Sequence, residues 1–100
     1  MGIDVYSYTH KGGNGMTLIL AIFRSRTQTM RFVDEMRRRG VRCDAVPTPL
    51  EARVGCGLSA KFLPCNLPMA RAIINYYRLN VFLGFYELKR IAGGTVVKKI

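Results

Sequence analysis

The 100-residue chain predicts an α+β fold in which two helices cover one face of an antiparallel sheet. Three observations support this fold class. Short apolar or alternating segments of strand length occur at four places, two segments with apolar residues at helical spacing lie among them, and glycines and prolines mark the joins. Hydrophobic residues make up 49% of the chain, which is enough apolar surface to offset the conformational entropy lost on folding.

One hundred residues suffice for one hydrophobic core but not for two, so we expect a single domain over residues 16–89. Residues 1–15 are polar and contain clustered glycines, which favours a flexible N-terminal arm or a leader. Residues 90–100 are expected to form a basic C-terminal tail that could add a short strand.

The first half of the domain contains a strand and a helix. Residues 17–23 are an apolar run typical of a strand covered on both faces. Ser25 or Thr27 can then cap a helix, since either side-chain oxygen can accept from the free amides of the first turn. Residues 37–39 are three arginines, suited to a last helical turn, and Gly40 ends the helix.

The second half repeats these signals in a different order. Residues 41–46 and 57–63 alternate apolar and polar side chains, which predicts two half-buried strands. A second helix is expected from Pro64 onward, and residues 81–88 form the last strand. The order β-α-β-β-α-β is that of a ferredoxin-like two-layer sandwich with an antiparallel sheet.

The sheet face away from the helices is expected to carry Ile19, Ala21 and Phe23. Such a face is more apolar than water tolerates well, which suggests a partner surface or a homodimer formed through it. A homodimeric regulatory scaffold of this kind should dissociate more easily when Phe23 is replaced by a polar residue.

The charge balance is strongly basic: Lys and Arg number 16, Asp and Glu 6, and the formal net charge is +10. A basic surface attracts phosphate regardless of sequence, so RNA or another polyanion is an alternative partner. The RNA-recognition motif has the same element order but places paired aromatics on its third strand, and residues 57–62 lack that pair. Because residues 37–39 also fit a solvated helix end, nucleic-acid binding ranks second.

Cys56 stands out because glycines flank it at the end of a loop. Glycines bring no side chains that would screen the thiol. The expected topology places this loop where the first helix begins, and helix amides and nearby arginines both favour the reactive thiolate and can hold an anion. The alternative is a small buried residue beside a tight turn, and spacing alone favours neither. The candidate site comprises Cys56, Gly55, Gly57, Ser25, Arg26, Thr27, Arg24 and Arg53.

The other two cysteines are expected to have different surroundings. Cys43 occupies one of the alternating positions of its strand that carry apolar residues, so it should lie in the core. Cys65 should lie at the opposite end of a strand, roughly 20 Å from Cys56, which is too far for a disulfide. Three cysteines without a CxxC motif, no apolar export signal and no run long enough to span a membrane indicate a reduced, cytoplasmic protein.

No other catalytic constellation is expected. The single histidine, His10, lies in residues 1–15, and Asp34 and Glu35 should lie on a solvated helix face, so neither a Cys-His relay nor paired carboxylates are available. The scattered cysteines give no metal site, and no cofactor is expected.

Three segments carry a resemblance to a known family: Gly40-Val41, Val46-Pro47-Thr48-Pro49 and Val54-Gly55-Cys56-Gly57-Leu58. With the strands and helices around them, residues 17–88 resemble the small bacterial family of selenium/sulfur carrier protein-like domains, sometimes linked to sulfur carriers of the SirA/TusA type. The resemblance implies that Cys56 holds sulfur or selenium as a persulfide or selenosulfide. A donor desulfurase or sulfur-carrier protein would load it and an acceptor enzyme would unload it, so a carrier is expected rather than an independent enzyme.

Overall fold

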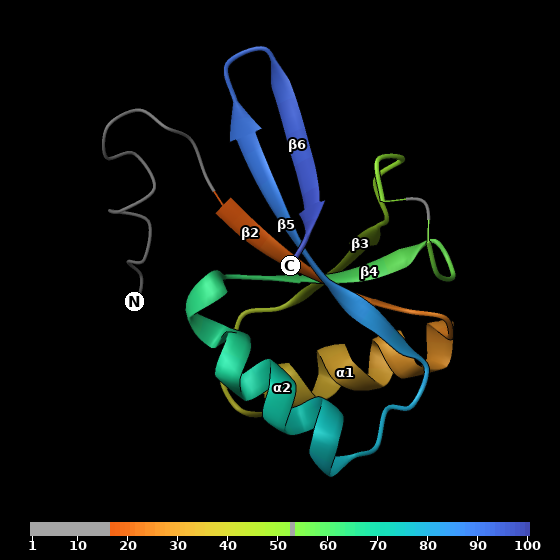
Figure 1. Ribbon diagram of the computed structural model, residues 1–100. Coiled ribbons are helices and arrows are strands. Elements are labelled where there is room, and N and C mark those ends of the chain that lie inside the picture. Colours follow the sequence, from red (N-terminus) through yellow and green to blue (C-terminus); the bar gives the residue numbers. More distant parts are fainter. Residues whose placement is uncertain (1–16, 53) are drawn as a thin grey trace.

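A five-stranded antiparallel sheet with two helices on one side makes up the fold (Figure 1). The computed structural model describes residues 17–52 and 54–100, so the expectations for residues 1–15, His10 and Arg53 lie outside the described residues. The α+β class, the antiparallel sheet and the two helices are confirmed. The elements are β2 (Thr17–Phe23), α1 (Arg26–Arg38), β3 (Asp44–Pro47), β4 (Leu58–Phe62), the 3-10 turn η2 (Pro64–Asn66), α2 (Leu67–Tyr76), β5 (Phe82–Ile91) and β6 (Gly94–Lys99).

The strands lie in the order β3-β4-β2-β5-β6. Helix α1 connects β2 to β3 and α2 connects β4 to β5, and in each case a third strand lies between the two that the helix connects. The central strand is β2, which pairs with both β4 and β5. The segment expected as a basic tail contains β6, which pairs with β5 and projects with it beyond the rest of the sheet (Figure 1).

Helix α1 begins at the first of the two expected caps. The Ser25 hydroxyl accepts a hydrogen bond of 3.1 Å from the amide of Gln28, which satisfies one of the free donors of the first turn. At the other end Gly40 follows with φ +80°, the conformation that glycine adopts most readily. None of the helices among the described residues is long and apolar enough to cross a membrane.

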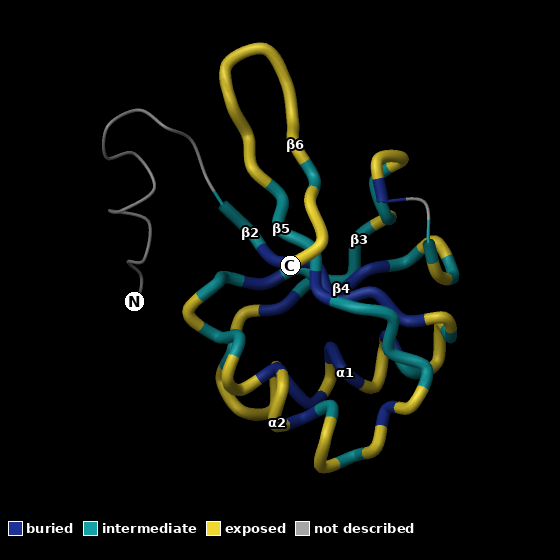
Figure 2. The backbone as a smooth tube through the Cα atoms, viewed as in Figure 1, coloured by how far each residue is buried: buried dark blue, intermediate teal, exposed yellow. Residues whose placement is uncertain are grey.

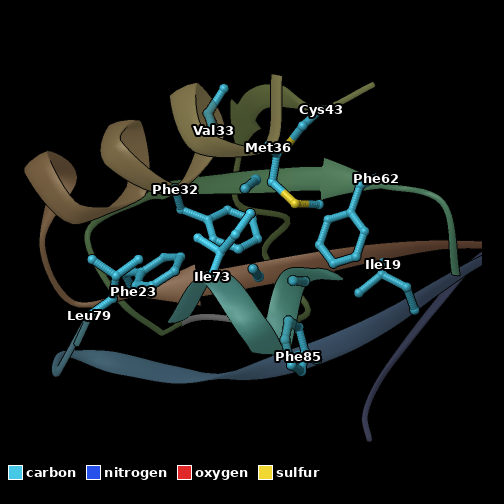
Figure 3. Close-up of a cluster of buried hydrophobic side chains, with 13 residues drawn as sticks. Ile19, Phe23, Phe32, Val33, Met36, Cys43, Phe62, Ile73, Leu79 and Phe85 are labelled. Atoms are coloured by element: carbon cyan, nitrogen blue, oxygen red, sulfur yellow. The ribbon is translucent and has the colours of Figure 1, made fainter. Parts of the chain in front are cut away.

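The main core lies between the helices and the sheet (Figure 3). The ring of Phe32 on α1 lies 5.4 Å from that of Phe23 and 5.9 Å from that of Phe62, measured between centroids. The expectation that Ile19, Ala21 and Phe23 face away from the helices is therefore wrong, since all three belong to this core. Strand β2 is apolar at almost every position, so its sequence does not distinguish its two faces. A polar residue at position 23 would disrupt the core rather than a dimer contact.

The face away from the helices carries a second, smaller apolar cluster. Leu20 and Ile22 are its buried strand residues, and the loop between β3 and β4 covers them with Ala52 and Val54. The half-buried members of the cluster that come from strands are Val46, Leu83, Tyr86, Leu88 and Val97. This face is thus closed near the loop and more open toward the hairpin of β5 and β6, which is largely exposed (Figure 2).

Glu35 does not lie on a solvated helix face, which corrects another expectation. Its side chain is only 5% exposed and forms ion pairs with Arg39 at 2.7 Å, Arg31 at 3.3 Å and Arg38 at 3.6 Å. The hydrogen bond from Arg39 is the main reason that the pKa of Glu35 lies below its usual range, and burial opposes it. The arginines at the end of α1 therefore neutralise a buried carboxylate as well as complementing the helix dipole.

Candidate functional site

The turn that contains Cys56 is pressed against the end of β2. Gly55 has φ +81°, and a Cβ added to it would lie 2.6 Å from the carbonyl oxygen of Phe23 and 2.7 Å from Cγ2 of Ile22. Only glycine fits this close approach to the backbone. The amide of Cys56 donates a 3.2 Å hydrogen bond to the same carbonyl oxygen of Phe23. Backbone contacts therefore fix Cys56 at the point where β2 ends and the chain turns into α1.

The thiol of Cys56 points toward the first turn of α1. Its Sγ lies 3.8 Å from Oγ1 of Thr29 and 3.7 Å from the carbonyl oxygen of Leu58. Cys56 itself is half-buried, whereas Thr29 is fully buried. The cysteine is thus neither open to solvent on all sides nor sealed in the core.

The Thr29 hydroxyl can form a hydrogen bond with Sγ of Cys56 whether the cysteine is a thiol or a thiolate. Its Oγ1 lies 2.9 Å from the carbonyl oxygen of Ser25, which also accepts from the amide of Thr29 at 3.0 Å. When Cys56 is a thiol, the hydroxyl can donate to Ser25 and accept from Sγ. When Cys56 is a thiolate, the hydroxyl can rotate and donate to the sulfur, and the Ser25 carbonyl still keeps one hydrogen bond.

Of the residues expected around Cys56, the described Arg24, Ser25, Arg26 and Thr27 lie where β2 ends and α1 begins. Ser25 caps the helix and is half-buried, while its neighbours in the sequence, Arg24, Arg26 and Thr27, are exposed. The amides of the first turn lack acceptors within the helix, which gives this end of α1 a partial positive charge. The sequence did not indicate that Thr29 belongs to this site. Its spacing of four residues from the cap is the only local signal, and its approach to Cys56 depends on how the loop before β4 folds back.

A shallow cavity of about 260 Å³ lies beside the turn. Gly55 and Gly57, the two neighbours of Cys56, line it together with Leu50, whose side chain is 74% exposed. The amide of Thr48 donates a 2.9 Å hydrogen bond to the carbonyl oxygen of Gly57 and closes the base of the loop. An apolar side chain therefore stands next to the cysteine turn on the protein surface.

The other cysteines differ from Cys56 as the sequence predicts. Cys43 is buried in the core, and desolvation is the main reason that its pKa is raised to about 12. Cys65 is exposed in η2, at the far end of β4 from Cys56, and all three cysteines are free. Within residues 17–52 and 54–100, no group of three or more His, Cys, Asp or Glu side chains could hold a metal ion.

The fold and this turn define a small α+β protein with a half-buried cysteine where a central strand meets a helix. Residues 18–87 match the model of the family described as "Putative Se/S carrier protein-like". The match covers well over half of the chain, so the protein belongs to this family, and the resemblance seen in the sequence is confirmed. No curated protein and no solved structure matches the chain. A carrier family implies transfer partners in general.

Proposed function

We propose that the protein carries sulfur or selenium on Cys56, as a persulfide or selenosulfide, in the cytoplasm. A donor desulfurase or sulfur-carrier protein loads the cysteine, and an acceptor enzyme unloads it. The observation that carries the proposal is the contact between Sγ of Cys56 and the buried hydroxyl of Thr29 at the start of α1. We also take the fold to be a ferredoxin-like sandwich extended by β6, because each helix crosses over one intervening strand.

Loading is an exchange in which the number of sulfur–sulfur bonds does not change. The Cys56 thiolate attacks the outer sulfur of a donor persulfide, the sulfur–sulfur bond of the donor breaks, and the donor cysteine leaves as a thiolate. The outer sulfur is then bonded to Sγ of Cys56. Unloading reverses the roles: an acceptor thiolate attacks the outer sulfur and Cys56 leaves as a thiolate. No external oxidant or reductant is consumed.

The surroundings of Cys56 fit these two steps. The Thr29 hydroxyl can donate to Sγ each time it becomes a thiolate, as nucleophile in loading and as leaving group in unloading. Arg24 and Arg26 are exposed and add positive potential at the end of α1, where an anionic sulfur species approaches. Arg53, by its place in the sequence, is assigned the same role, while Ser25, Thr27 and the amides of the first turn steady the thiolate.

The proposal is tested by loading the protein from a defined persulfide. Because Cys65 is exposed and would react as well, the reference protein is Cys65→Ser, treated with glutathione persulfide at neutral pH and followed by intact mass. We expect it to gain one sulfur atom on Cys56 and to return that sulfur to an added thiol. The matched control is Cys56→Ser/Cys65→Ser, which should gain none. Equal sulfur uptake by both proteins, or none by the reference, would refute the carrier role.

The role of Thr29 is tested separately with two variants of similar size. In the Cys65→Ser background, Thr29→Val removes the hydroxyl and keeps the shape of the buried side chain, whereas Thr29→Ser keeps the hydroxyl. A hydrogen bond to a charged group contributes about 1.5–3 kcal/mol, so Cys56 should react with iodoacetamide roughly tenfold more slowly in the valine variant. The serine variant should react at nearly the reference rate. A loss of rate in both variants would assign Thr29 a packing role only.

A further inference from the structure

The sheet face away from the helices carries a row of residues that crosses four strands. Lys61 on β4 pairs with Leu20 on β2, Leu20 pairs with Tyr86 on β5, and Tyr86 pairs with Lys99 on β6. Directly paired residues project from the same side of a sheet. Because Leu20 and Tyr86 belong to the cluster on the side without helices, Lys61 and Lys99 project on that side too. An aromatic ring therefore lies between two lysines across the sheet.

The lysine at the end of this row lies along the sheet. Gly84 precedes Tyr86 by two residues on β5, and a Cβ added to it would lie 2.8 Å from Cε of Lys99. The Lys99 side chain thus passes over the glycine, next to the strand that carries Tyr86. Beyond this row the hairpin continues with half-buried Leu88 and exposed Arg90, which by the alternation along β5 lie on the same side as Tyr86.

The charges on this face are mostly positive. Lys61, Lys99 and Arg90 contribute three cations. Asp44, which stands opposite Lys61 on β3, pairs with Arg37 at 3.4 Å. Glu87 projects from the opposite side of β5 and approaches Lys89 at 3.9 Å. The face around Tyr86 therefore combines an apolar and aromatic surface with cations on both sides of the ring.

We propose that this face binds a single-stranded nucleic acid, with a base stacked on Tyr86 and phosphates bound by Lys61 and Lys99. Aromatic side chains in a positively charged groove are how proteins bind single strands with little sequence preference, since every base has a face that can stack. An acidic polypeptide would use the lysines but would leave the ring without a partner. Residues 57–62 lack the aromatic pair that the RNA-recognition motif has on its third strand, but Tyr86 on β5 supplies a ring outside that segment. This function goes beyond the carrier role and does not involve Cys56.

The test uses the full chain and a fluorescein-labelled decauridine, with binding followed by fluorescence anisotropy at several salt concentrations. Tyr86→Leu keeps an apolar side chain in the cluster but removes the ring, and it should weaken binding at least about fivefold. Tyr86→Phe should bind like the unchanged protein. Cys56→Ser should also bind unchanged, so failure of the carrier role and failure of this proposal are distinguishable.

Two double variants with the same change of net charge separate the face from general attraction. Lys61→Gln/Lys99→Gln removes the cations beside the ring, whereas Lys89→Gln/Lys98→Gln removes two lysines of the opposite side of the sheet. The first pair should reduce the slope of log affinity against log salt by about 0.7 for each lysine. The second pair should change it by much less. This comparison decides the proposal even if Tyr86→Leu fails to fold, because neither pair alters the buried clusters.

Four outcomes would overturn the proposal. The first is that the decauridine does not bind at low salt, and the second is that the two double variants weaken binding equally. The third is that a folded Tyr86→Leu protein binds as well as the unchanged one. Displacement of the decauridine by a glutamate decapeptide at equal concentration would also overturn it. That result would assign the face to acidic polypeptides.

Discussion

Gly55→Ala should destabilise the protein more than Gly57→Ala, although both glycines flank Cys56 and both have positive φ. Gly55 has φ +81° and Gly57 has φ +90°, so alanine meets a similar backbone penalty of about 1–2 kcal/mol at each. The gain from a less flexible unfolded chain is also the same at both positions and cancels in the comparison. The two sites differ in what a methyl group would meet.

At position 57 a Cβ would have no heavy atom within 4 Å, whereas at position 55 it would lie 2.6 Å from the carbonyl oxygen of Phe23. That oxygen is backbone in the central strand and cannot rotate away. The turn must shift instead, which breaks the 3.2 Å hydrogen bond from the amide of Cys56 to the same oxygen. The lost hydrogen bond adds about 1 kcal/mol. We therefore expect a loss of about 2–3 kcal/mol at position 55 and about 1–2 kcal/mol at position 57.

The measurement is urea-induced unfolding followed by far-UV circular dichroism, because the chain contains no tryptophan. The free energies of unfolding of the two variants are compared at one pH by linear extrapolation. The shifted turn should also separate Sγ of Cys56 from Thr29, so only Gly55→Ala should slow the reaction of Cys56 with iodoacetamide. Equal stability and equal Cys56 reactivity in the two variants would refute the close-approach argument.

Three further predictions concern the capped helix, its buried carboxylate and the core cysteine. Ser25→Ala removes the oxygen that accepts from the Gln28 amide and should lower the free energy of unfolding by about 1 kcal/mol in the same urea assay; an unchanged value would contradict the cap. The pKa of Glu35 is lower in the folded protein than in the unfolded chain, so acidification protonates the unfolded chain first. The stability that this carboxylate contributes above its usual pKa is therefore lost as the pH falls through its pKa in the folded protein. Glu35→Gln should flatten that pH dependence, and parallel profiles would contradict it. Cys43, buried and with a pKa of about 12, should stay unlabelled by iodoacetamide at pH 8 until urea unfolds the chain; labelling as fast as that of exposed Cys65 would contradict its burial.

The features that could be predicted from the sequence are those with local physical causes. The Ser25 cap and the Gly40 stop of α1 depend on a few neighbouring residues, and so do the alternating strands. The positions of Cys43 in the core and of Cys56 near the start of α1 then follow from strand parity and from the order of the elements. Short-range signals and chain order together were enough to place the cysteines relative to the sheet.

What could not be predicted depends on tertiary contacts. Strand β2 is apolar on both sides, and only packing decides that Phe23 faces the helices and Leu20 does not. Glu35 becomes buried because arginines of its own helix fold over it and Arg39 also reaches the Tyr77 hydroxyl at 3.2 Å. Thr29 meets Cys56 only because the loop before β4 returns to the end of β2.

The two edges of the sheet have consequences for self-association. Unpaired strand edges can template aggregation, and proteins blunt them with prolines, lysines and short strands. Strand β3 has four residues and ends at Pro47, which cannot donate to a neighbouring chain. Strand β6 instead has exposed Val96 protected by the charges of Lys98 and Lys99. Salt screens those charges, so concentrated salt should promote edge-to-edge aggregation through β6.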